Sequence, residues 1–329
     1  MDNINIIDNY DRRLSYLRIS ITDRCNLRCK YCTPLTPLTM LKHDEILQYE
    51  EILRIVRVGV RHGISKVRIT GGEPLVRLGV YDFLRELNRI EGLNDVSLTT
   101  NGVLLRDNVD KIKDAGIKRI NISLDSLERS QFQEITGRDY FNKVWEGINL
   151  SLEAGFNPIK INVVAVNGMN EKEIVDFAEL SIKYPFHIRF IEFMPIGQSK
   201  IHADKPLLTP EIKKITETLG ELIPVKNGTN DGPAFRYRFN NALGEVGFIS
   251  PISNHFCSRC NRLRLTANGN LRACLLSDRQ VDLRAPMRNG CSDEEILAIF
   301  KQAMKLKQER HKMGQTDDSV LTQMSSIGG

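Results

Sequence analysis

The sequence lacks any long hydrophobic stretch, because no apolar run approaches the about eighteen residues that a membrane span needs. Its first residues, Met1-Asp2-Asn3, lack the basic start and the apolar stretch of a secretory signal. It also lacks a large excess of charge of one sign, since 46 basic side chains face 41 acidic ones, for a net charge of +5. That excess is too small to indicate a nucleic-acid partner, although it allows a local basic pocket for an anionic substrate. We therefore expect a cytoplasmic protein with no membrane or nucleic-acid partner.

Low-complexity segments are absent as well, and 41% of the residues are hydrophobic, so disorder across the chain is not expected. A length of 329 residues favours two domains, or one barrel-sized domain with an appendage.

Cysteine is scarce but clustered. Six of the seven cysteines form two groups of three: Cys25, Cys29 and Cys32, and then Cys257, Cys260 and Cys274. The remaining Cys291 is interpreted as an ordinary thiol. Structural disulfides are rare in the reducing cytoplasm, and packing alone would not group thiols in this way. The two groups therefore predict metal centres.

The first group has the spacing C-x3-C-x2-C. A structural zinc site wants four protein ligands, and a cubane iron–sulfur cluster wants one thiolate for each of four irons. Three cysteines thus predict a cluster with one iron open to a ligand that is not protein. Arg24 and Arg28 nearby would favour the thiolate form. A zinc site completed by a distant histidine, or thiols that simply pack, are the alternatives.

The second group is again three thiolates, with His255 close by, so a Cys3His zinc site is the alternative to a cluster there. The basic run Arg262-Leu263-Arg264 lies between the second and third of these cysteines. On a strand, Arg262 and Arg264 would face the same side and offer two guanidinium groups to phosphate or nucleobase groups. A solvated strand face is the simpler alternative.

Over the first two-thirds, short β-rich runs alternate with amphipathic stretches of helical length, which favours parallel βαβ units. The expected strands span residues 16–21, 66–70, 95–99, 119–124, 159–166 and 186–193. The expected helices span residues 45–62, 81–90, 106–115, 141–154 and 172–184. Polar residues follow several strands, and strand ends that converge on one rim are typical of a barrel mouth. Since six units fall short of eight, we predict an α/β fold with an open, partial (β/α)6 TIM-like barrel.

The pattern changes beyond about residue 196. A helix is expected over residues 209–219, and short β-like runs over 236–239 and 245–249. We predict a barrel domain over residues 1–225 and a smaller C-terminal α+β domain over 226–329 that covers the opening. Residues 315–329 are polar and weakly patterned, most simply a flexible tail.

The C-x3-C-x2-C run, with Tyr31 before its third cysteine, resembles the signature of the radical S-adenosylmethionine (SAM) superfamily. Gly71-Gly72-Glu73-Pro74 resembles the segment that holds the methionine amino group there. Combined with C-x2-C-x13-C near the end, the sequence resembles the GTP 3′,8-cyclase family, which catalyses the first step of molybdenum cofactor biosynthesis. The resemblance spans essentially the whole chain, with no departure at the cysteines.

This resemblance implies two [4Fe–4S] clusters, one that chelates SAM at its open iron and one whose open iron meets the guanine of GTP. The cysteines of the first group, Arg262 and Arg264 would be catalytic. The positions that match SAM contacts are Tyr31, Gly72, Ser123 and Met194. The positions that match GTP contacts are Arg18, Arg68, Thr99, Lys160, Arg262, Leu263 and Arg264. A triphosphate needs several cations, so the basic residues make physical sense.

The family reaction would use one electron, from a reductase or flavodoxin-type donor, to cleave SAM into methionine and a 5′-deoxyadenosyl radical. That radical would remove hydrogen from C3′ of GTP, and attack on C8 would give 3′,8-cyclo-7,8-dihydro-GTP for a downstream cyclic pyranopterin monophosphate synthase. The resemblance also implies a homodimer and a terminal Gly328-Gly329 that threads into the active site. Two other readings are a peptide-modifying radical SAM enzyme and a non-catalytic iron–sulfur carrier, although carriers usually close each cluster with four cysteines.

Overall fold

The structure is a computed structural model and describes residues 5–34, 39–197, 201, 206–226, 228, 232–311 and 320–328. In these residues the strands form one twelve-stranded sheet, in the order β12-β11-β10-β1-β2-β3-β4-β5-β6-β9-β8-β7. Its centre holds the six predicted strands, all parallel and in chain order. These are β1 (Tyr16–Ser20), β2 (Lys66–Thr70), β3 (Asp95–Thr100), β4 (Ile120–Ser123), β5 (Ile159–Ala165) and β6 (Phe186–Glu192).

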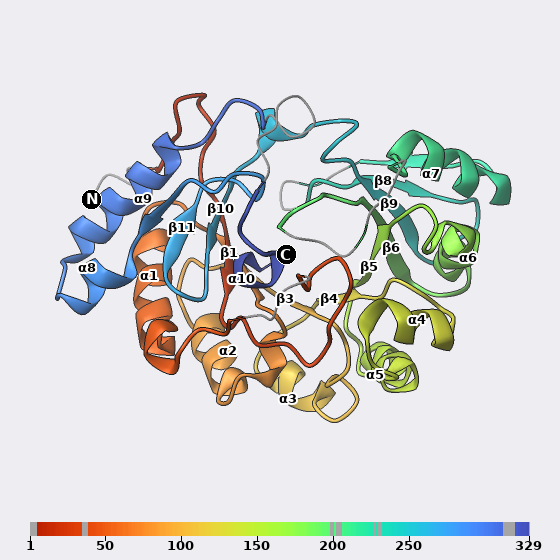
Figure 1. The fold of residues 1–329 in the computed structure, drawn as a ribbon, viewed down its shortest axis with the longest axis horizontal. Helices are drawn as coiled ribbons and strands as arrows, with labels where there is room; N and C mark the ends of the chain where they lie inside the picture. The colour runs from red at the N-terminus through yellow and green to blue at the C-terminus, as the bar shows by residue number, and fades with distance from the viewer. Residues whose placement is uncertain are drawn as a thin grey trace.

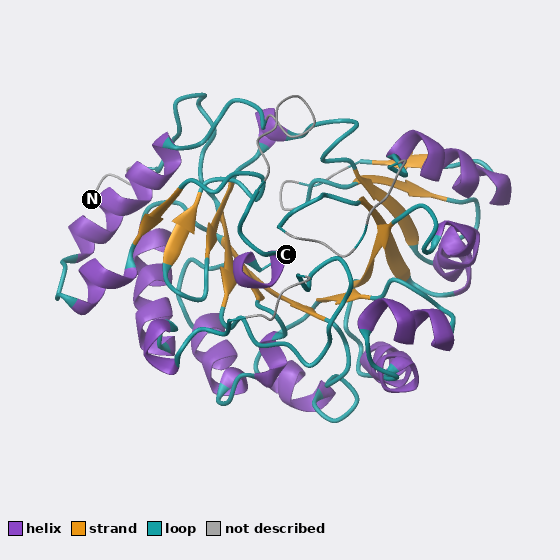
Figure 2. Ribbon diagram, in the orientation of Figure 1, coloured by secondary structure: helices purple, strands orange, loops and turns teal. Residues whose placement is uncertain are grey.

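Helices connect these strands and lie along the outer side of the curved sheet (Figure 2). They are α1 (Tyr49–Arg61), α2 (Val80–Asn88), α3 (Val109–Asp114), α4 (Arg129–Thr136), α5 (Phe141–Glu153) and α6 (Ile174–Lys183). Helix α4 is not among the predicted helices, because it is short and has few apolar side chains. The predicted alternation is otherwise confirmed.

Burial explains the alternation within the strands. In α1, Ile52, Ile55 and Val56 recur at helical spacing and are buried. In β1, Leu17 and Ile19 belong to the same apolar core, whereas Arg18 between them lines the interior cavity. Successive side chains of a strand point to opposite faces, so the helices cover one face and polar side chains can occupy the other.

The C-terminal third contributes strands to both margins of the sheet. On one side, β10 (Arg262–Leu265) runs parallel to β1, followed by antiparallel β11 (Asn270–Arg272) and β12 (Gln280–Asp282). On the other side, β9 (Glu245–Ile249) runs parallel to β6, followed by antiparallel β8 (Phe235–Arg238) and β7 (Ile223–Val225). The barrel is therefore partial and open, as predicted, and Figure 1 shows the opening between the two margins. The next helices along the chain are α7 (Thr209–Thr216), α8 (Arg284–Arg288) and α9 (Asp293–Lys305).

The chain returns to the opening at its end. The short helix α10 (Met324–Ile327) lies in the middle of the molecule (Figure 1). Val320 and Ile327 are buried in a small cluster with Ile196, and Gly197 N donates to Val320 O at 2.8 Å. The expected flexible tail is thus wrong for residues 320–328. A segment this short shows no periodicity, so only its contacts reveal that it is held.

Hydrogen bonds of polar side chains also hold the tail. Arg272 is fully buried and donates to Thr322 Oγ1 at 2.9 Å and to Asp278 Oδ1 at 3.1 Å. Asp278 in turn accepts from the backbone N–H of Leu321 at 2.7 Å. The tail is therefore fastened to the β11 side as well as to the end of β6. Within the described part of the chain, no helix is long and apolar enough to cross a membrane.

Candidate active site

One cavity of about 320 Å³ lies inside the partial barrel. All six clustered cysteines line it, although the two groups lie far apart in the sequence. The first group sits on the loop after β1, and the second on the turn before β10 and on the segment after β11. Because β10 pairs with β1, the sheet brings both groups to the same interior.

The thiols of the first cysteine group are half-buried, and their partial removal from water raises their pKa, that of Cys32 to about 12. Cys25 Sγ accepts from Leu27 N at 3.4 Å and lies 3.6 Å from Asn101 Nδ2. A metal must therefore displace the protons of these thiols when it binds. Three thiolates beside an open cavity are the donor set that fits a cubane with one iron left to a small molecule.

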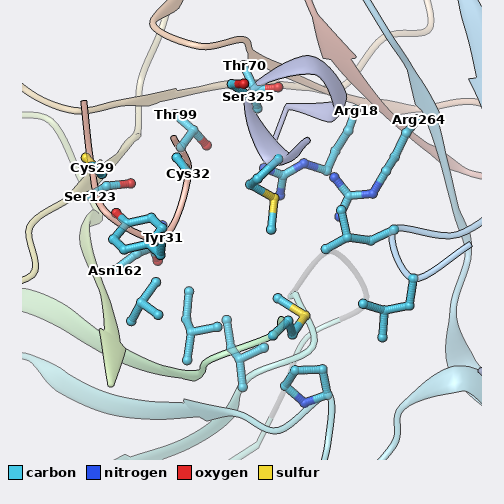
Figure 3. A pocket seen from close by; sticks show the side chains of 18 of the residues that line it. Arg18, Cys29, Tyr31, Cys32, Thr70, Thr99, Ser123, Asn162, Arg264 and Ser325 are labelled. Carbon is cyan, nitrogen blue, oxygen red and sulfur yellow. The ribbon is translucent and has the colours of Figure 1, made fainter. Parts of the chain in front are cut away.

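Tyr31 stands next to this group and is held by a buried carboxylate. Its hydroxyl donates to Asp125 Oδ2 at 2.6 Å, and Asp125 Oδ1 accepts from Val164 N at 2.8 Å. Burial raises the pKa of Asp125 to about 6. Figure 3 shows the Tyr31 ring on the same wall as Ser123 and Asn162. The Asp125 contact therefore fixes the ring beside the wall that β4 and β5 form.

The glycine pair after β2 approaches the first cysteine loop very closely. A Cβ at Gly72 would lie 2.5 Å from Arg24 O, so no larger residue fits there without moving the backbone. The following Glu73 is fully buried and accepts from Leu75 N, Thr100 Oγ1 and Asn101 N at 2.7–3.0 Å. Burial raises its pKa to about 7. This carboxyl group ties the loop after β2 to the loop after β3.

Three arginines lie in one row across three neighbouring strands. Arg264 on β10 pairs in register with Arg18 on β1, which pairs with Arg68 on β2. All three are at least nine-tenths buried and line the cavity. Burial lowers the pKa of Arg18 to about 10, so its guanidinium remains charged at neutral pH. Figure 3 shows Arg18 and Arg264 pointing into the same part of the cavity, across from Tyr31. Such a row fits an anionic ligand.

A second basic row lies two residues earlier on the same strands, where Arg262, Tyr16 and Lys66 pair in register. Burial alone would raise the pKa of the Tyr16 phenol, but the surrounding cations, Arg68 foremost, lower it to about 8. The side of the cavity formed by β10, β1 and β2 is therefore strongly electropositive.

Thr99, Met194 and Arg262 also line the cavity, as do Tyr31, Gly72 and Ser123 among the predicted contacts. Lys160 and Leu263 are not among its lining residues. Lys160 is buried on β5, and the Leu263 side chain lies in the apolar core on the opposite face of β10. Their predicted contacts with GTP stay predictions.

Arg189 also lines the cavity, although it is not among the site residues predicted from the sequence. It lies on β6 in register with Asn162 on β5, is 4% exposed, and lines the cavity. The sequence contains a pattern that indicates this position. Arg189 lies between Ile188 and Phe190, just as Arg18 lies between two apolar residues of β1. A charged residue inside an apolar strand marks a face that is not packed against helices.

The second cysteine group differs from the first in its electrostatics. Burial would raise the pKa of Cys260, but the charges of Arg262 and Lys307 outweigh it and lower the pKa to about 6. Lys307 Nζ donates to Cys260 Sγ at 3.3 Å. One thiolate of this group is thus stabilised in the absence of any metal.

His255, the fourth ligand of the zinc alternative, has another partner. Its Nδ1 lies 2.7 Å from Pro251 O, and its ring packs edge-on against His311 at 4.2 Å between centroids. Among the described residues, no three His, Cys, Asp or Glu side chains converge as ligands of one metal ion. A zinc site draws every ligand to one ion, whereas a cubane binds each thiolate at a different iron. For the second group, the cluster and the Cys3His site both stay predictions.

The tail reaches the row of arginines. Gly328 O accepts from Arg264 Nη1 at 2.9 Å, and Met324 and Ser325 line the cavity. Gly328 has φ +75°, and a Cβ there would lie 2.4 Å from Thr70 Oγ1. Only glycine fits this position without strain. Gly329 lies outside the described residues.

Comparison with known proteins agrees with this geometry. Residues 19–181 match the Radical SAM superfamily, and residues 186–313 match the family Molybdenum Cofactor Synthesis C. A GTP 3′,8-cyclase of Pelotomaculum thermopropionicum is 48% identical over 98% of this chain and 99% of its own length. A GTP 3′,8-cyclase of Moorella thermoacetica is 47% identical, with the same coverage of each chain.

Solved structures share the fold at much lower identity. Streptococcus suis SuiB bound to S-adenosylmethionine has a TM-score of 0.64 and 15% identity, covering 98% of this chain and 73% of that chain. SuiB bound to its precursor peptide SuiA has a TM-score of 0.62 and 17% identity, covering 83% and 63%. At this identity the similarity shows the fold alone.

Proposed function

Because this chain belongs to the GTP 3′,8-cyclase family of the radical SAM superfamily, we propose a role for each part of its cavity in the reaction of that family. The enzyme converts GTP and SAM to 3′,8-cyclo-7,8-dihydroguanosine 5′-triphosphate, methionine and 5′-deoxyadenosine. This is the first step of molybdenum cofactor biosynthesis. The enzyme uses a [4Fe–4S] cluster and SAM, as its superfamily implies. The peptide-modifying alternative has only the fold similarity to SuiB in its favour.

The observation that carries the proposal is the convergence of two three-cysteine groups on one cavity. The first group, Cys25, Cys29 and Cys32, holds the cluster that binds SAM. The second group, Cys257, Cys260 and Cys274, holds a second [4Fe–4S] cluster that faces the guanine. When bound, the first cluster supplies the electron that cleaves SAM.

The SAM site is the wall that carries Tyr31 and Ser123 (Figure 3). Gly72 lines this wall, and the backbone carbonyl of Arg24 lies so close that no side chain fits at this position. Met194, at the end of β6, completes this side. Asp125 positions Tyr31 through the 2.6 Å hydrogen bond.

The GTP site lies at the opposite, basic side of the cavity. The row of Arg264, Arg18 and Arg68, extended by Arg262, binds the triphosphate, since guanidinium forks match phosphate oxygens. Thr99 adds a hydroxyl to this side of the cavity. Lys160 and Leu263, which do not line the cavity, are the remaining predicted GTP contacts. Arg189 faces the same cavity from β6 and adds a cation that the family resemblance did not include. Holding both ends of GTP keeps C3′ near the SAM wall and orients C8 for attack.

The tail completes the site. Gly328 O occupies one guanidinium donor of Arg264, so the tail and the nucleotide share one arginine. Gly328 fits this position because it has no side chain.

Other parts of the proposal rest on the family alone. A reductase or flavodoxin-type protein supplies electrons, and a cyclic pyranopterin monophosphate synthase takes the product. The enzyme works in the cytoplasm as a homodimer. Residues 1–225 provide the radical SAM barrel, and residues 226–329 provide the second cluster, the arginine pair and the tail.

Two measurements test this function. Iron and sulfide analysis with Mössbauer spectra on anaerobically purified protein should give eight irons in two cubanes, whereas four irons with zinc would contradict the second cluster. With GTP deuterated at C3′, the label should appear in 5′-deoxyadenosine. Failure of that transfer, with SAM cleavage intact, would contradict the proposed placement of GTP.

A further inference from the structure

Lys307 lies two residues beyond α9 and has no role in the reaction described so far. It is 5% exposed, and its ammonium group donates three hydrogen bonds. The acceptors are Cys260 Sγ at 3.3 Å, Arg262 O at 2.9 Å and Ala273 O at 3.2 Å. An ammonium group has three donors, so all are used. These bonds join the two stretches of chain that carry the second cysteine group, because Ala273 immediately precedes Cys274.

The charge of Lys307 has one anionic contact in the described part of the chain. No carboxylate of those residues pairs with it, and of its three acceptors only Cys260 can carry a negative charge. A buried ammonium without an anion is strongly unfavourable. The thiolates of the second group are therefore the natural counter-charge of Lys307.

Arg12 provides a contrast within the same region. It donates to Cys257 O at 2.6 Å and to Gln308 O at 2.8 Å, so it also touches the second group and the segment after α9. Its charge is neutralised by Asp8, whose carboxylate lies 2.5 Å from Arg12 Nε. Arg12 therefore holds the backbone of this region by hydrogen bonds, and its charge is neutralised by Asp8. The charge of Lys307, in contrast, stabilises negative charge on the Cys260 sulfur.

We propose that Lys307 is a positioning residue of the second cluster, whose charge sets the reduction potential of that cluster. This rests on the proposed function, in which the second cysteine group holds a cubane. Reduction adds one negative charge to a cluster that three thiolates already make anionic. A buried cation 3.3 Å from one of those sulfurs stabilises the reduced state more than the oxidised state. Lys307 thus raises the reduction potential of the second cluster. Less free energy is then needed to reduce this cluster, which faces the guanine.

The test isolates the second cluster in the full-length chain. Replacing Cys25, Cys29 and Cys32 by alanine leaves only the second group to bind a cluster, which is reconstituted anaerobically and titrated by EPR-monitored reduction. Into this background we would introduce Lys307→Met, which keeps the length and removes the charge, and Lys307→Arg, which keeps the charge. Lys305→Met is the matched control, because Lys305 is exposed on the preceding turn of the same segment.

We expect Lys307→Met to shift the midpoint potential of the cluster to a lower value, and Lys307→Arg and Lys305→Met to leave it near the parent value. Loss of iron from Lys307→Met with retention in Lys307→Arg would show that the charge is needed to hold the cluster and would overturn a role in setting its potential. Equal potentials in Lys307→Met and the parent, or loss of iron from both Lys307 variants, would overturn it. Absence of any cubane in the parent itself contradicts the proposed second cluster instead, so the two failures are distinguishable.

Discussion

Arg18, Arg68 and Arg264 are unusual residues for the interior of a sheet. Each sits in a strand between apolar neighbours and is at least nine-tenths buried. Burying a charged group is costly unless an opposite charge accompanies it. An anionic ligand in the cavity would offset part of this cost, which is consistent with the proposed binding of the triphosphate by these arginines.

The substitution Arg264→Lys tests whether the guanidinium group of Arg264 binds GTP. Lysine keeps the positive charge but loses the planar fork that binds phosphate and the bond to Gly328 O. Because a hydrogen bond to a charged group is worth about 1.5–3 kcal/mol, Arg264→Lys should lower kcat/KM for GTP by about 10- to 100-fold. GTP-dependent formation of 5′-deoxyadenosine measures it. Arg279→Lys, an exposed position nearby, is the control, and an unchanged kcat/KM in Arg264→Lys would contradict the role of Arg264.

A second prediction at this scale concerns Gly328. In Gly328→Ala the new Cβ would lie 2.4 Å from Thr70 Oγ1 and 2.9 Å from Ser20 Cβ, so the tail must withdraw from Arg264. We expect turnover to fall by roughly 5- to 150-fold, since such a clash costs about 1–3 kcal/mol. Gly290→Ala is a matched control, because Gly290 has a similar φ of +81° but nothing within 4 Å of its Cβ. Equal turnover in both variants would show that the tail contact is dispensable.

At the scale of elements, the cavity depends on how strands and the tail are joined at the margins. The β6–β9 pair brings His187 opposite Glu245, with the His187 Nδ1 and Glu245 Oε2 atoms 3.4 Å apart. Burial lowers the pKa of His187 to about 4 despite this carboxylate. His187 is therefore neutral in the folded protein at neutral pH.

This pair predicts a pH dependence of stability. Below the ordinary pKa of 6.5, the unfolded chain binds a proton at His187 that the folded chain does not, so stability falls as the pH drops from about 6.5 toward 4. His187→Asn should remove about 1–2 kcal/mol of the loss between pH 7 and pH 5, as urea unfolding at each pH would measure. His43→Asn, at an exposed histidine, should change nothing. A variant that loses as much stability as the wild type would refute the assignment.

The tail is the other element whose attachment can be tested. Thr322→Val keeps the shape of the side chain but leaves Arg272 and Asp278, its two polar partners, each short of one hydrogen bond. We expect hydrogen exchange of residues 320–328 to increase, by a local cost of about 1–3 kcal/mol, while GTP turnover falls. Leu321→Ala alters a side chain that is 76% exposed in the same segment and should leave exchange unchanged. Equal hydrogen exchange in the two variants would mean that the hydrogen bonds of Thr322 do not hold the tail.

At the scale of the whole molecule, the C-terminal third is built into the barrel at both margins. β10 covers the free edge of β1, and β9 covers the free edge of β6. The proposed division at residue 225 is therefore one of function, because the edges of the barrel are paired by strands from beyond it.

This arrangement predicts that residues 1–225 do not fold alone. Without their partners, β1 and β6 expose unpaired backbone groups, and such edges promote aggregation. We expect the fragment to aggregate and to take up little iron, and co-expression of residues 226–329 to restore soluble protein with the first cluster. A soluble fragment that unfolds cooperatively and binds SAM would contradict this expectation.

The sequence alone determined the local features of this protein. The six parallel strands, most of their helices and the two cysteine groups follow from periodicity and spacing, which depend on neighbouring residues. It missed α4 and Arg189, and it treated residues 320–328 as flexible, although Val320 and Ile327 are buried against Ile196. Short segments carry too few residues for a periodic signal.

Tertiary structure alone decided which distant residues meet. The pairing of β10 with β1 places Arg264 beside Arg18 and brings the second cysteine group to the cavity of the first. The same tertiary structure brings Lys307 into hydrogen-bond contact with Cys260, and Gly328 with Arg264. No local pattern encodes such contacts, because the register of strands remote in the chain depends on the packing of the whole sheet.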